Sequence, residues 1–330
     1  MDKIVKHENG IKQLDYLNIA KGIGIILVVI GHCIPDYSTD SGVSDPLLRM
    51  IYNAIYSFHM PLFFFISGYL TSRIAIKVQQ QSTLNIIKKK FNRLLIPYFF
   101  VGICYTPFKL LLSSFANKPY DISNIWAIFI GVNPDYELWF LYALFIINCI
   151  VGLLDYKSSK FNLLLAAILA LFSPIMPQVT GNLFFFLLGM YFRDNYSKYL
   201  ERINTDVLAF LMLTFVGSNY LLYQMGYKWA HMITALSGIF ICIKVSECIE
   251  QQTISKKLKN LLILLGSYSM DIYILSDIVK IPFRIILWNK MHLYFTSFYV
   301  CSFFSILISF FISKYFIRNN KILKKLILGM

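Results

Sequence analysis

The sequence predicts an all-α, polytopic membrane protein, a bundle of about ten transmembrane helices that fills residues 1–330 as one domain. Three observations predict this class. The 330 residues are 57% hydrophobic and only 15% charged. The mean hydropathy is +0.61. Apolar stretches recur along the whole chain at membrane-spanning length, which leaves no room for a separate soluble catalytic domain.

Ten apolar segments are expected to be helices, judged against the roughly 20 residues that cross a bilayer. They are 14–34, 47–71, 94–113, 138–154, 161–175, 182–192, 206–226, 229–249, 261–287 and 293–316. The sixth is short for a full crossing, so we expect it to be tilted or joined to the fifth near Pro174 and Pro177. Segment 72–92 is expected to be an amphipathic helix on the cytoplasmic membrane surface.

The connections between these segments alternate in charge. The first contains Asp36, Asp40 and Asp45 without Lys or Arg, whereas the next is rich in Lys and Arg between Arg73 and Arg93. By the positive-inside rule, the basic connections and both termini are predicted to be cytoplasmic. The same rule explains the net charge of +14 and argues against a nucleic-acid partner.

A lysine and a histidine interrupt the first apolar segment. Between Lys21 and His32 the chain contains only apolar residues and glycine. The spacing is close to three helical turns, so both side chains lie on one face, about 16 Å apart along the axis. Polar groups at lipid depth are costly to bury, which makes both residues functional candidates. The alternative is that both are satisfied polar groups that fix helix packing.

The second segment carries His59 and Pro61 near its middle. Proline frees a backbone carbonyl and kinks a helix. Ser67 and Gly68 permit close approach of a neighbouring helix, so packing explains them as well as substrate contact does. Packing alone accounts less easily for His59. No metal site is expected, because the histidines lack nearby Cys or carboxylate companions and the six cysteines form no CxxC pair.

Two cations mark the entrance of the third segment. Lys90 and Arg93 are three residues apart and therefore neighbours on a helix face. They suit a phosphate-rich ligand, since the Arg fork matches phosphate geometry. The alternative is a stop signal made of snorkelling side chains.

The later segments add further polar residues at membrane depth. Trp139 marks an outer membrane interface. In the ninth segment Asp277 and Lys280 are spaced to pair. Asp271 is either neutralised within the bundle or functional.

Four motifs stand in a characteristic order: Lys21 to His32, Phe58-His59-Met60-Pro61 through Ser67-Gly68, Lys90 and Arg93 before Pro97-Tyr98, and Leu138-Trp139-Phe140-Leu141. In order and spacing they resemble the membrane acyltransferase family 3, and within it the fucose 4-O-acetylase-like branch. Many relatives have Arg at the positions of Lys21 and Lys90. Many also have a Tyr-Leu-x-His-like run where this chain has Tyr273-Ile-Leu-Ser276-Asp277.

The resemblance implies a bundle of about ten helices that moves acyl groups, usually acetyl from acetyl-CoA, onto hydroxyls of extracytoplasmic or lipid-linked glycans. It implies Lys21 and His32 as the first-helix motif, and Lys90 and Arg93 as the residues that engage the CoA donor. No cofactor is expected to be bound permanently, since acetyl-CoA is a donor substrate. The expected partners are acetyl-CoA, a glycan or glycolipid acceptor and the lipid bilayer of the plasma membrane. Nothing in the sequence fixes an oligomeric state.

The chemical hypothesis assigns His32 as the base that takes the acceptor hydroxyl proton, because histidine has an ordinary pKa of about 6.5. Lys21 orients the donor or holds negative charge, and His59 donates to the oxyanion or orients the acceptor. A competing reading is a transporter or flippase for a saccharide or organic anion, with Lys21, His59, Asp271 and Lys280 lining one polar cavity. A third is a non-catalytic scaffold for glycan assembly.

Overall fold

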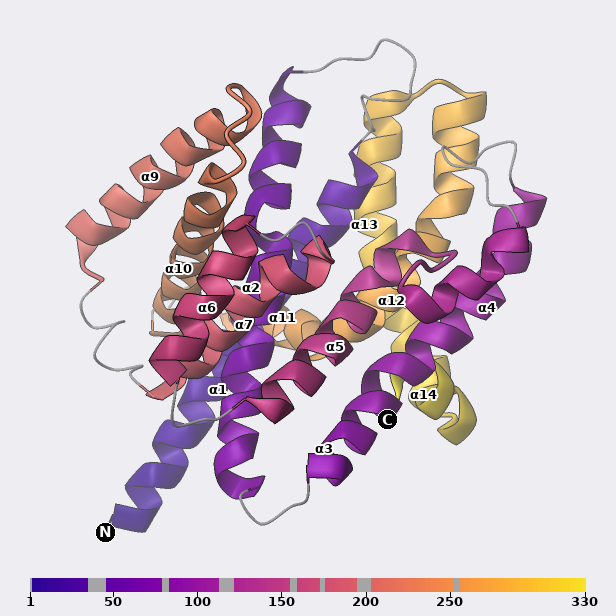
Figure 1. The fold of residues 1–330 in the computed structure, drawn as a ribbon. Helices are drawn as coiled ribbons and strands as arrows, with labels where there is room; N and C mark the ends of the chain where they lie inside the picture. Colours follow the sequence, from indigo (N-terminus) through magenta and orange to yellow (C-terminus); the bar gives the residue numbers. More distant parts are fainter. Residues whose placement is uncertain are drawn as a thin grey trace.

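The computed structural model describes residues 2–34, 46–78, 83–112, 122–154, 159–172, 176–194, 203–251 and 256–330. Within these residues the regular secondary structure is helical and contains no strand, and Figure 1 shows helices packed against one another as a bundle. The predicted all-α class is confirmed. The acidic connection with Asp36, Asp40 and Asp45, and Pro174 between the fifth and sixth segments, lie outside the described residues.

The helices in chain order are α1 (Asp2–Cys33), α2 (Pro46–Val78), α3 (Thr83–Lys90), η1 (Phe91–Leu95), α4 (Ile96–Leu111), η3 (Ile122–Ile130), η4 (Tyr136–Leu138), α5 (Trp139–Leu153), α6 (Ser159–Phe172), α7 (Pro177–Asp194), α9 (Thr205–Tyr223), α10 (Ala230–Gln251), α11 (Lys256–Ser267), α12 (Ser269–Phe283), η6 (Arg284–Lys290), α13 (Tyr294–Ile312), η7 (Ser313–Ile317) and α14 (Lys321–Leu328). Every predicted apolar segment overlaps at least one of these helices. The segment predicted as one surface helix, 72–92, belongs instead to the end of α2, to α3 and to the start of η1.

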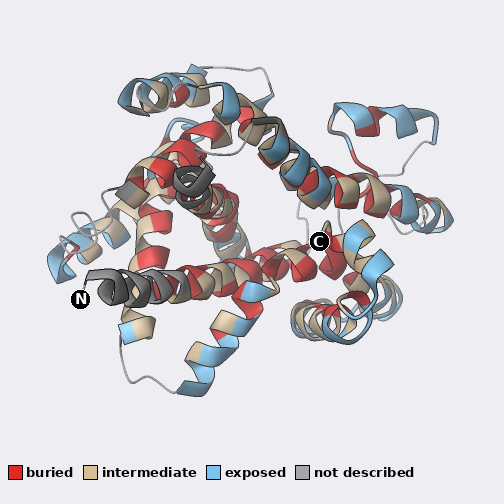
Figure 2. Cartoon of the chain, turned by 90° about the horizontal axis from the view of Figure 1, so that it is seen from below, coloured by how far each residue is buried: buried red, intermediate tan, exposed pale blue. Residues whose placement is uncertain are grey.

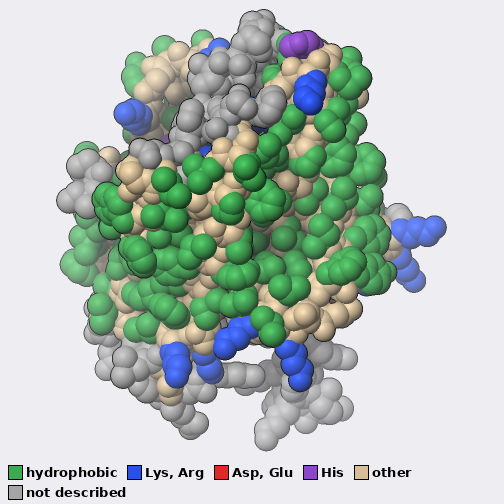
Figure 3. Space-filling view, turned by 90° about the vertical axis from the view of Figure 1, so that its right-hand side faces the viewer, with side chains coloured by type: hydrophobic (Ala, Val, Ile, Leu, Met, Phe, Trp, Pro, Cys, Tyr) green, Lys and Arg blue, Asp and Glu red, His purple; other side chains and the backbone are tan. Residues whose placement is uncertain are grey.

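Seven helices of the described chain are long and apolar enough to span a membrane, and α11 with α12 adds an eighth if this bent pair is one span. The shorter apolar helix α6 packs against α7. In Figure 3 hydrophobic side chains cover the visible face as a broad band, with Lys and Arg along its lower edge. The chain is therefore a multi-pass membrane protein. The count of about ten spans and the cytoplasmic termini stay predictions.

Glycines allow two of the closest helix contacts. A Cβ atom added to Gly68 of α2 would lie 1.9 Å from the carbonyl oxygen of Phe186 in α7. At Gly266 of α11 it would lie 1.9 Å from the carbonyl oxygen of Asn18 in α1. Only glycine fits at either crossing, because any side chain would push the backbones apart. Figure 2 shows the result, with buried residues concentrated where helices face one another.

The predicted segment 261–287 is not one straight helix, because the structure breaks it between α11 and α12 with a bend of 78°. Arg318 lies at this break. Its Nε donates to Asp271 Oδ2 of α12 (2.7 Å), and its Nη2 donates to the Ser267 carbonyl at the end of α11 (3.1 Å). The last carbonyls of a helix have no partner within that helix, so the guanidinium supplies the missing donor.

Asp271 is thereby neutralised inside the bundle. Its side chain is 1% exposed, and the Ser313 hydroxyl also donates to it. A buried carboxylate needs both a counter-charge and hydrogen-bond donors, and Asp271 has them from Arg318 and Ser313. Of the two readings that the sequence leaves open for Asp271, its contacts support the structural one.

Replacing Arg318 with Ala is expected to destabilise the folded protein by about 3 kcal/mol, because Asp271 is then buried without its cation. The apparent melting temperature in detergent measures this loss. Lys244→Ala is the control, since it breaks the Lys244–Glu247 pair within α10 (2.9 Å), whose carboxylate is 12% exposed against 1% for Asp271, and is expected to cost less than about 1 kcal/mol. Equal losses in the two variants would contradict a special role for Arg318.

Candidate active site

A cavity of about 310 Å³, which we call the inner cavity, is basic at one end. Lys21 of α1, Lys90 of α3 and Arg93 of η1 line it, together with Ser67 and Thr71 of α2. No Asp or Glu is among the described residues that line it. Three cations without a lining carboxylate favour an anionic ligand.

Two of these cations are held by neutral partners. Lys90 Nζ donates to Thr71 Oγ1 (3.3 Å), and Arg93 Nη1 donates to the Leu328 carbonyl of α14 (2.9 Å). Neither contact neutralises charge, so both residues keep their attraction for an anion. The predicted Lys90 and Arg93 pair is brought together here, and Lys21 joins it from α1.

The backbone near Arg93 departs from regular α-helix. The chain passes from α3 to α4 through the π-helical turn η1. Pro97 lies just beyond it and has no N–H, so it cannot bond the Arg93 carbonyl as an α-helix would require. Wide turns of this kind often occur at functional sites.

A second cavity of about 380 Å³, which we call the outer cavity, lies toward the opposite end of α1. Its walls combine aromatic rings with ionisable groups. They include Tyr52, Tyr56, Tyr105, Tyr136, Trp139, His32, Glu137, Asp277, Lys280, Lys109 and Arg284. Such a surface suits a ligand that has both flat apolar faces and many hydroxyls.

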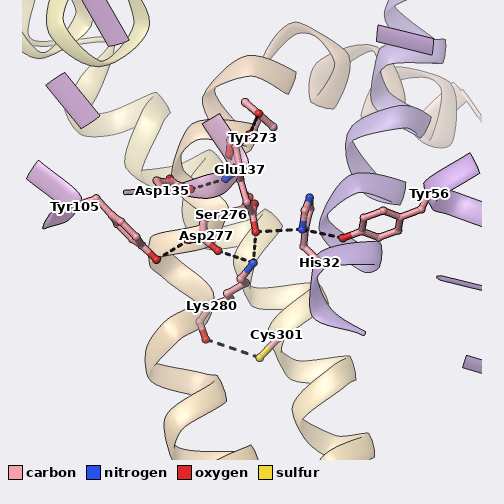
Figure 4. Close-up of polar contacts among 10 residues, drawn as sticks. All are labelled: His32, Tyr56, Tyr105, Asp135, Glu137, Tyr273, Ser276, Asp277, Lys280 and Cys301. Carbon is pink, nitrogen blue, oxygen red and sulfur yellow. Dashed lines mark hydrogen bonds and ion pairs between the residues drawn. The ribbon is translucent and has the colours of Figure 1, made fainter. Parts of the chain in front are cut away.

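One ring nitrogen holds His32 in the outer cavity. Its Nδ1 lies 3.2 Å from Glu137 Oε1 and 3.1 Å from the Tyr56 hydroxyl (Figure 4). Neither contact uses Nε2. In the tautomer with its proton on Nδ1, beside the Glu137 carboxylate, the imidazole presents the lone pair of Nε2, which is the arrangement of a general base.

Glu137 belongs to a buried cluster that joins four parts of the chain (Figure 4). Lys280 contacts Glu137 Oε1 and lies 2.5 Å from Asp277 Oδ1. The Tyr105 hydroxyl donates to Asp277 Oδ2 (2.7 Å), and the Tyr273 hydroxyl donates to the Glu137 carbonyl. With two carboxylates and one ammonium, the cluster gains a matching charge when His32 takes up a proton.

Asp135 fixes the short helix that carries Glu137. Its Oδ1 accepts the Glu137 N–H (3.0 Å) and so caps η4. Burial, and to a smaller extent the Asp277 carboxylate, raise the pKa of Asp135 to about 8. Burial thus favours the neutral form of this side chain.

The two cavities come within one helical turn of each other. On α1 the inner cavity includes Val28 and the outer cavity includes Gly31, a rise of about 4.5 Å. On α5 the neighbours Trp139 and Phe140 line the outer and the inner cavity respectively. The two cavities therefore approach each other at the level of Val28 and Gly31 on α1 and of Trp139 and Phe140 on α5.

The structure places the predicted site residues in two different cavities or outside both. Lys21 and His32 share α1, but Lys21 lines the inner cavity and His32 the outer one. Ser67 lines the inner cavity and Trp139 the outer one. Gly68 serves the contact of α2 with α7.

His59 is buried beside the outer cavity. Its Nδ1–H donates to the Ile55 carbonyl (2.8 Å), and its ring centroid is 6.4 Å from that of His32. Neither His59 nor Asp271 is among the described residues that line these two cavities. In the part of the chain that the structure describes, Lys21 and Lys280 line different cavities, so the four residues expected for a transporter do not share either of these cavities.

We call the buried polar cluster around His32 and Glu137 the His32 cluster, and the sequence predicts part of it. The spacing of Asp277 and Lys280 predicts their pairing, and the 2.5 Å contact confirms it. Glu137 and Tyr56 are missed as partners of His32, because they come from separate segments. A carboxylate directly before an apolar span, as in Glu137-Leu-Trp139, is the signal that points to the first of them.

Known proteins are similar to this chain in sequence. Residues 14–314 match the family model described as an acyltransferase domain, Acyl_transf_3. The nodulation protein NolL of Mesorhizobium japonicum is 27% identical over 228 residues, which are 68% of this chain and 54% of that relative. The nodulation protein NolL of Sinorhizobium fredii is 40% identical over 86 residues, which are 25% of this chain and 22% of that relative. No solved structure matches the chain significantly.

The chain thus spans about half the length of the first of these curated relatives and less of the second. The family model, by contrast, covers nearly all of the chain, including every residue of the His32 cluster and all three cations of the inner cavity. This chain belongs to acyltransferase family 3 and is a multi-pass membrane protein.

Proposed function

We propose that this chain is a plasma-membrane O-acetyltransferase that moves an acetyl group from cytoplasmic acetyl-CoA to a hydroxyl of an extracytoplasmic or lipid-linked glycan. The observation that carries the proposal is the setting of His32. Its Nδ1 is held by Glu137 and Tyr56 at one cavity, and a second, basic cavity comes within one helical turn of it.

The charge of the inner cavity supports a phosphorylated donor. Lys21, Lys90 and Arg93 line it without a carboxylate among the described lining residues. Arg93 uses Nη1 for the Leu328 carbonyl, and a guanidinium has further N–H groups for a phosphate. Acetyl-CoA has the phosphates for this end and a slender arm that places the thioester deeper in the cavity.

The outer cavity supports a glycan acceptor. Aromatic rings such as Trp139 and Tyr136 pack against the C–H faces of a sugar, and the ionisable groups bind its hydroxyls. Glu137 Oε2 is buried and has no hydrogen-bond partner in the protein, so it is available to accept a sugar hydroxyl.

The reaction follows from the protonation state of His32. Its Nε2 takes the proton of the acceptor hydroxyl as the alcohol oxygen bonds to the thioester carbonyl carbon. The tetrahedral intermediate collapses, the C–S bond breaks, and the CoA thiolate takes the proton back from Nε2–H. The products are the acetyl ester and free CoA. Glu137 stabilises the imidazolium that exists between these two steps, and Lys280 keeps Glu137 in position.

His59 acts as a positioning residue in this scheme. A neutral imidazole that donates Nδ1–H to the Ile55 carbonyl has no second N–H to offer an oxyanion. Its ring packs edge-on against that of Tyr56, with centroids 4.9 Å apart. It therefore supports Tyr56, which contacts His32 directly.

Replacing His32 with Asn is expected to lower the rate of ester formation about 10³-fold, because no general base is left. Glu137→Gln is expected to lower it about 10²-fold, since the imidazolium loses its counter-charge. The rate is followed by mass spectrometry of ester-linked acetyl on surface glycan from cells producing each variant.

The matched control for these variants is His292→Asn. His292 is exposed and has φ 54°, a conformation that Asn tolerates, so acetylation should be unchanged. Full activity of a His32→Asn protein that is present in the membrane at wild-type level would overturn the assignment.

Saturating CoA is expected to stabilise the purified protein by about 2.7 kcal/mol at one hundred times the dissociation constant, seen as a rise in melting temperature. Arg93→Gln and Lys90→Gln should each raise that constant about tenfold and so shrink the rise. Lys88→Gln is the control, because Lys88 lies exposed on α3 and is not among the inner-cavity residues. A wild-type protein indifferent to CoA would favour a transporter instead.

A further inference from the structure

Arg93 is held by the last helix of the described chain. Its Nη1 donates to the carbonyl of Leu328 (2.9 Å), which lies 235 residues further along the sequence. Leu328 is fully buried and is the last residue of α14. Because the final carbonyls of a helix have no partner within it and carry partial negative charge, a guanidinium is a favourable partner there.

Both ends of α14 are fixed by their own capping interactions. At the start, Asn320 Oδ1 accepts the N–H groups of Ile322 (2.9 Å) and Leu323 (3.1 Å). At the end, Gly329 has φ 63°, the left-handed conformation that commonly terminates a helix, and its N–H donates to the Lys325 carbonyl (3.1 Å). The position of the Leu328 carbonyl is therefore determined by the helix itself.

The contact between α14 and η1 leaves no room for a side chain. A Cβ atom on Gly329 would lie 2.3 Å from the Asn92 carbonyl oxygen and 2.6 Å from Arg93 Cα. Both of these are backbone atoms, which cannot rotate away as the end of a flexible side chain can. Gly329 thus lets α14 approach the backbone of Arg93 directly.

The segment before α14 contacts the inner cavity at a second point. Arg318 donates to the carbonyl of Ser267, and Ser267 lines that cavity. The chain from Arg318 to Gly329 therefore touches both the Ser267 and the Arg93 sides of the same cavity.

We propose that α14 is a built part of the donor site: the Leu328 carbonyl and the close contact at Gly329 hold the Arg93 guanidinium in the orientation that binds a donor phosphate. This inference rests on the proposed function, in which the inner cavity takes CoA. One donor of the guanidinium is used by Leu328, and the remaining N–H groups are presented to the cavity as a preorganised fork. Leu328 and Gly329 are positioning residues, since they act through Arg93.

The test compares two glycines that share one backbone conformation. Gly329→Ala adds a Cβ that collides with the backbone of η1, whereas Gly226→Ala, at φ 75° before α10, meets nothing within 4 Å. Both substitutions have a similar cost for alanine at positive φ, so they are matched in strain. The dissociation constant of CoA is measured by calorimetry on the purified full chain, alongside that of pantetheine, which has no phosphate.

Gly329→Ala is expected to raise the dissociation constant of CoA about tenfold, while Gly226→Ala leaves it unchanged. Neither variant should alter the affinity for pantetheine. In an Arg93→Gln background Gly329→Ala should have no further effect, because the two changes remove the same interaction. If Gly329→Ala does not accumulate in membranes, deletion of residues 321–330 is expected to give the same tenfold change.

The outcomes separate this inference from the function on which it rests. If the wild-type protein does not bind CoA, the donor assignment fails and the role of α14 fails with it. If the wild-type protein binds CoA but Gly329→Ala binds it equally well, only the role of α14 is overturned. An equal loss of affinity for CoA and pantetheine, or a further loss in the Arg93→Gln background, would also overturn it.

Discussion

The requirement that ionised groups buried at lipid depth find counter-charges organises this protein. Lys280 lies between Glu137 and Asp277, and Arg318 pairs with Asp271. Because an unpaired buried ion is far more costly than a paired one, these contacts define which helices must be neighbours. The inner cavity is the exception, since its lining cations have no lining carboxylate. The described cations of the inner cavity therefore indicate where an anionic ligand would supply the balancing charge.

Those pairings also explain why the site forms only in the assembled bundle. His32 comes from α1, Glu137 from η4, and Asp277 with Lys280 from α12. None of these elements contains a complete acid–base arrangement. The close contacts at Gly68 and Gly266 hold α2 against α7 and α11 against α1. Small residues thus set the distance between helices, and charged residues determine which helices pair.

The sequence predicts the class and the helical segments well, because hydropathy and span length are local properties. It also predicts the Asp277–Lys280 contact, since both residues lie on one helix face. The break between α11 and α12 depends on Arg318, which is remote in sequence, so the apolar pattern of 261–287 reads as one span. Glu137 is missed for the same reason. The shared face of Lys21 and His32 is a property of one helix, whereas their division between two cavities depends on the side chains of other helices.

The side chains between the two cavities bear on whether ions can cross the bundle. Val28 lines the inner cavity and Gly31 lines the outer one, so the two cavities approach each other at this level of α1. The Phe140 and Tyr273 rings, whose centroids are 5.7 Å apart, form part of the inner wall at this level. The described residues thus line two adjacent cavities and not one continuous channel, and a continuous channel is what ion conduction requires.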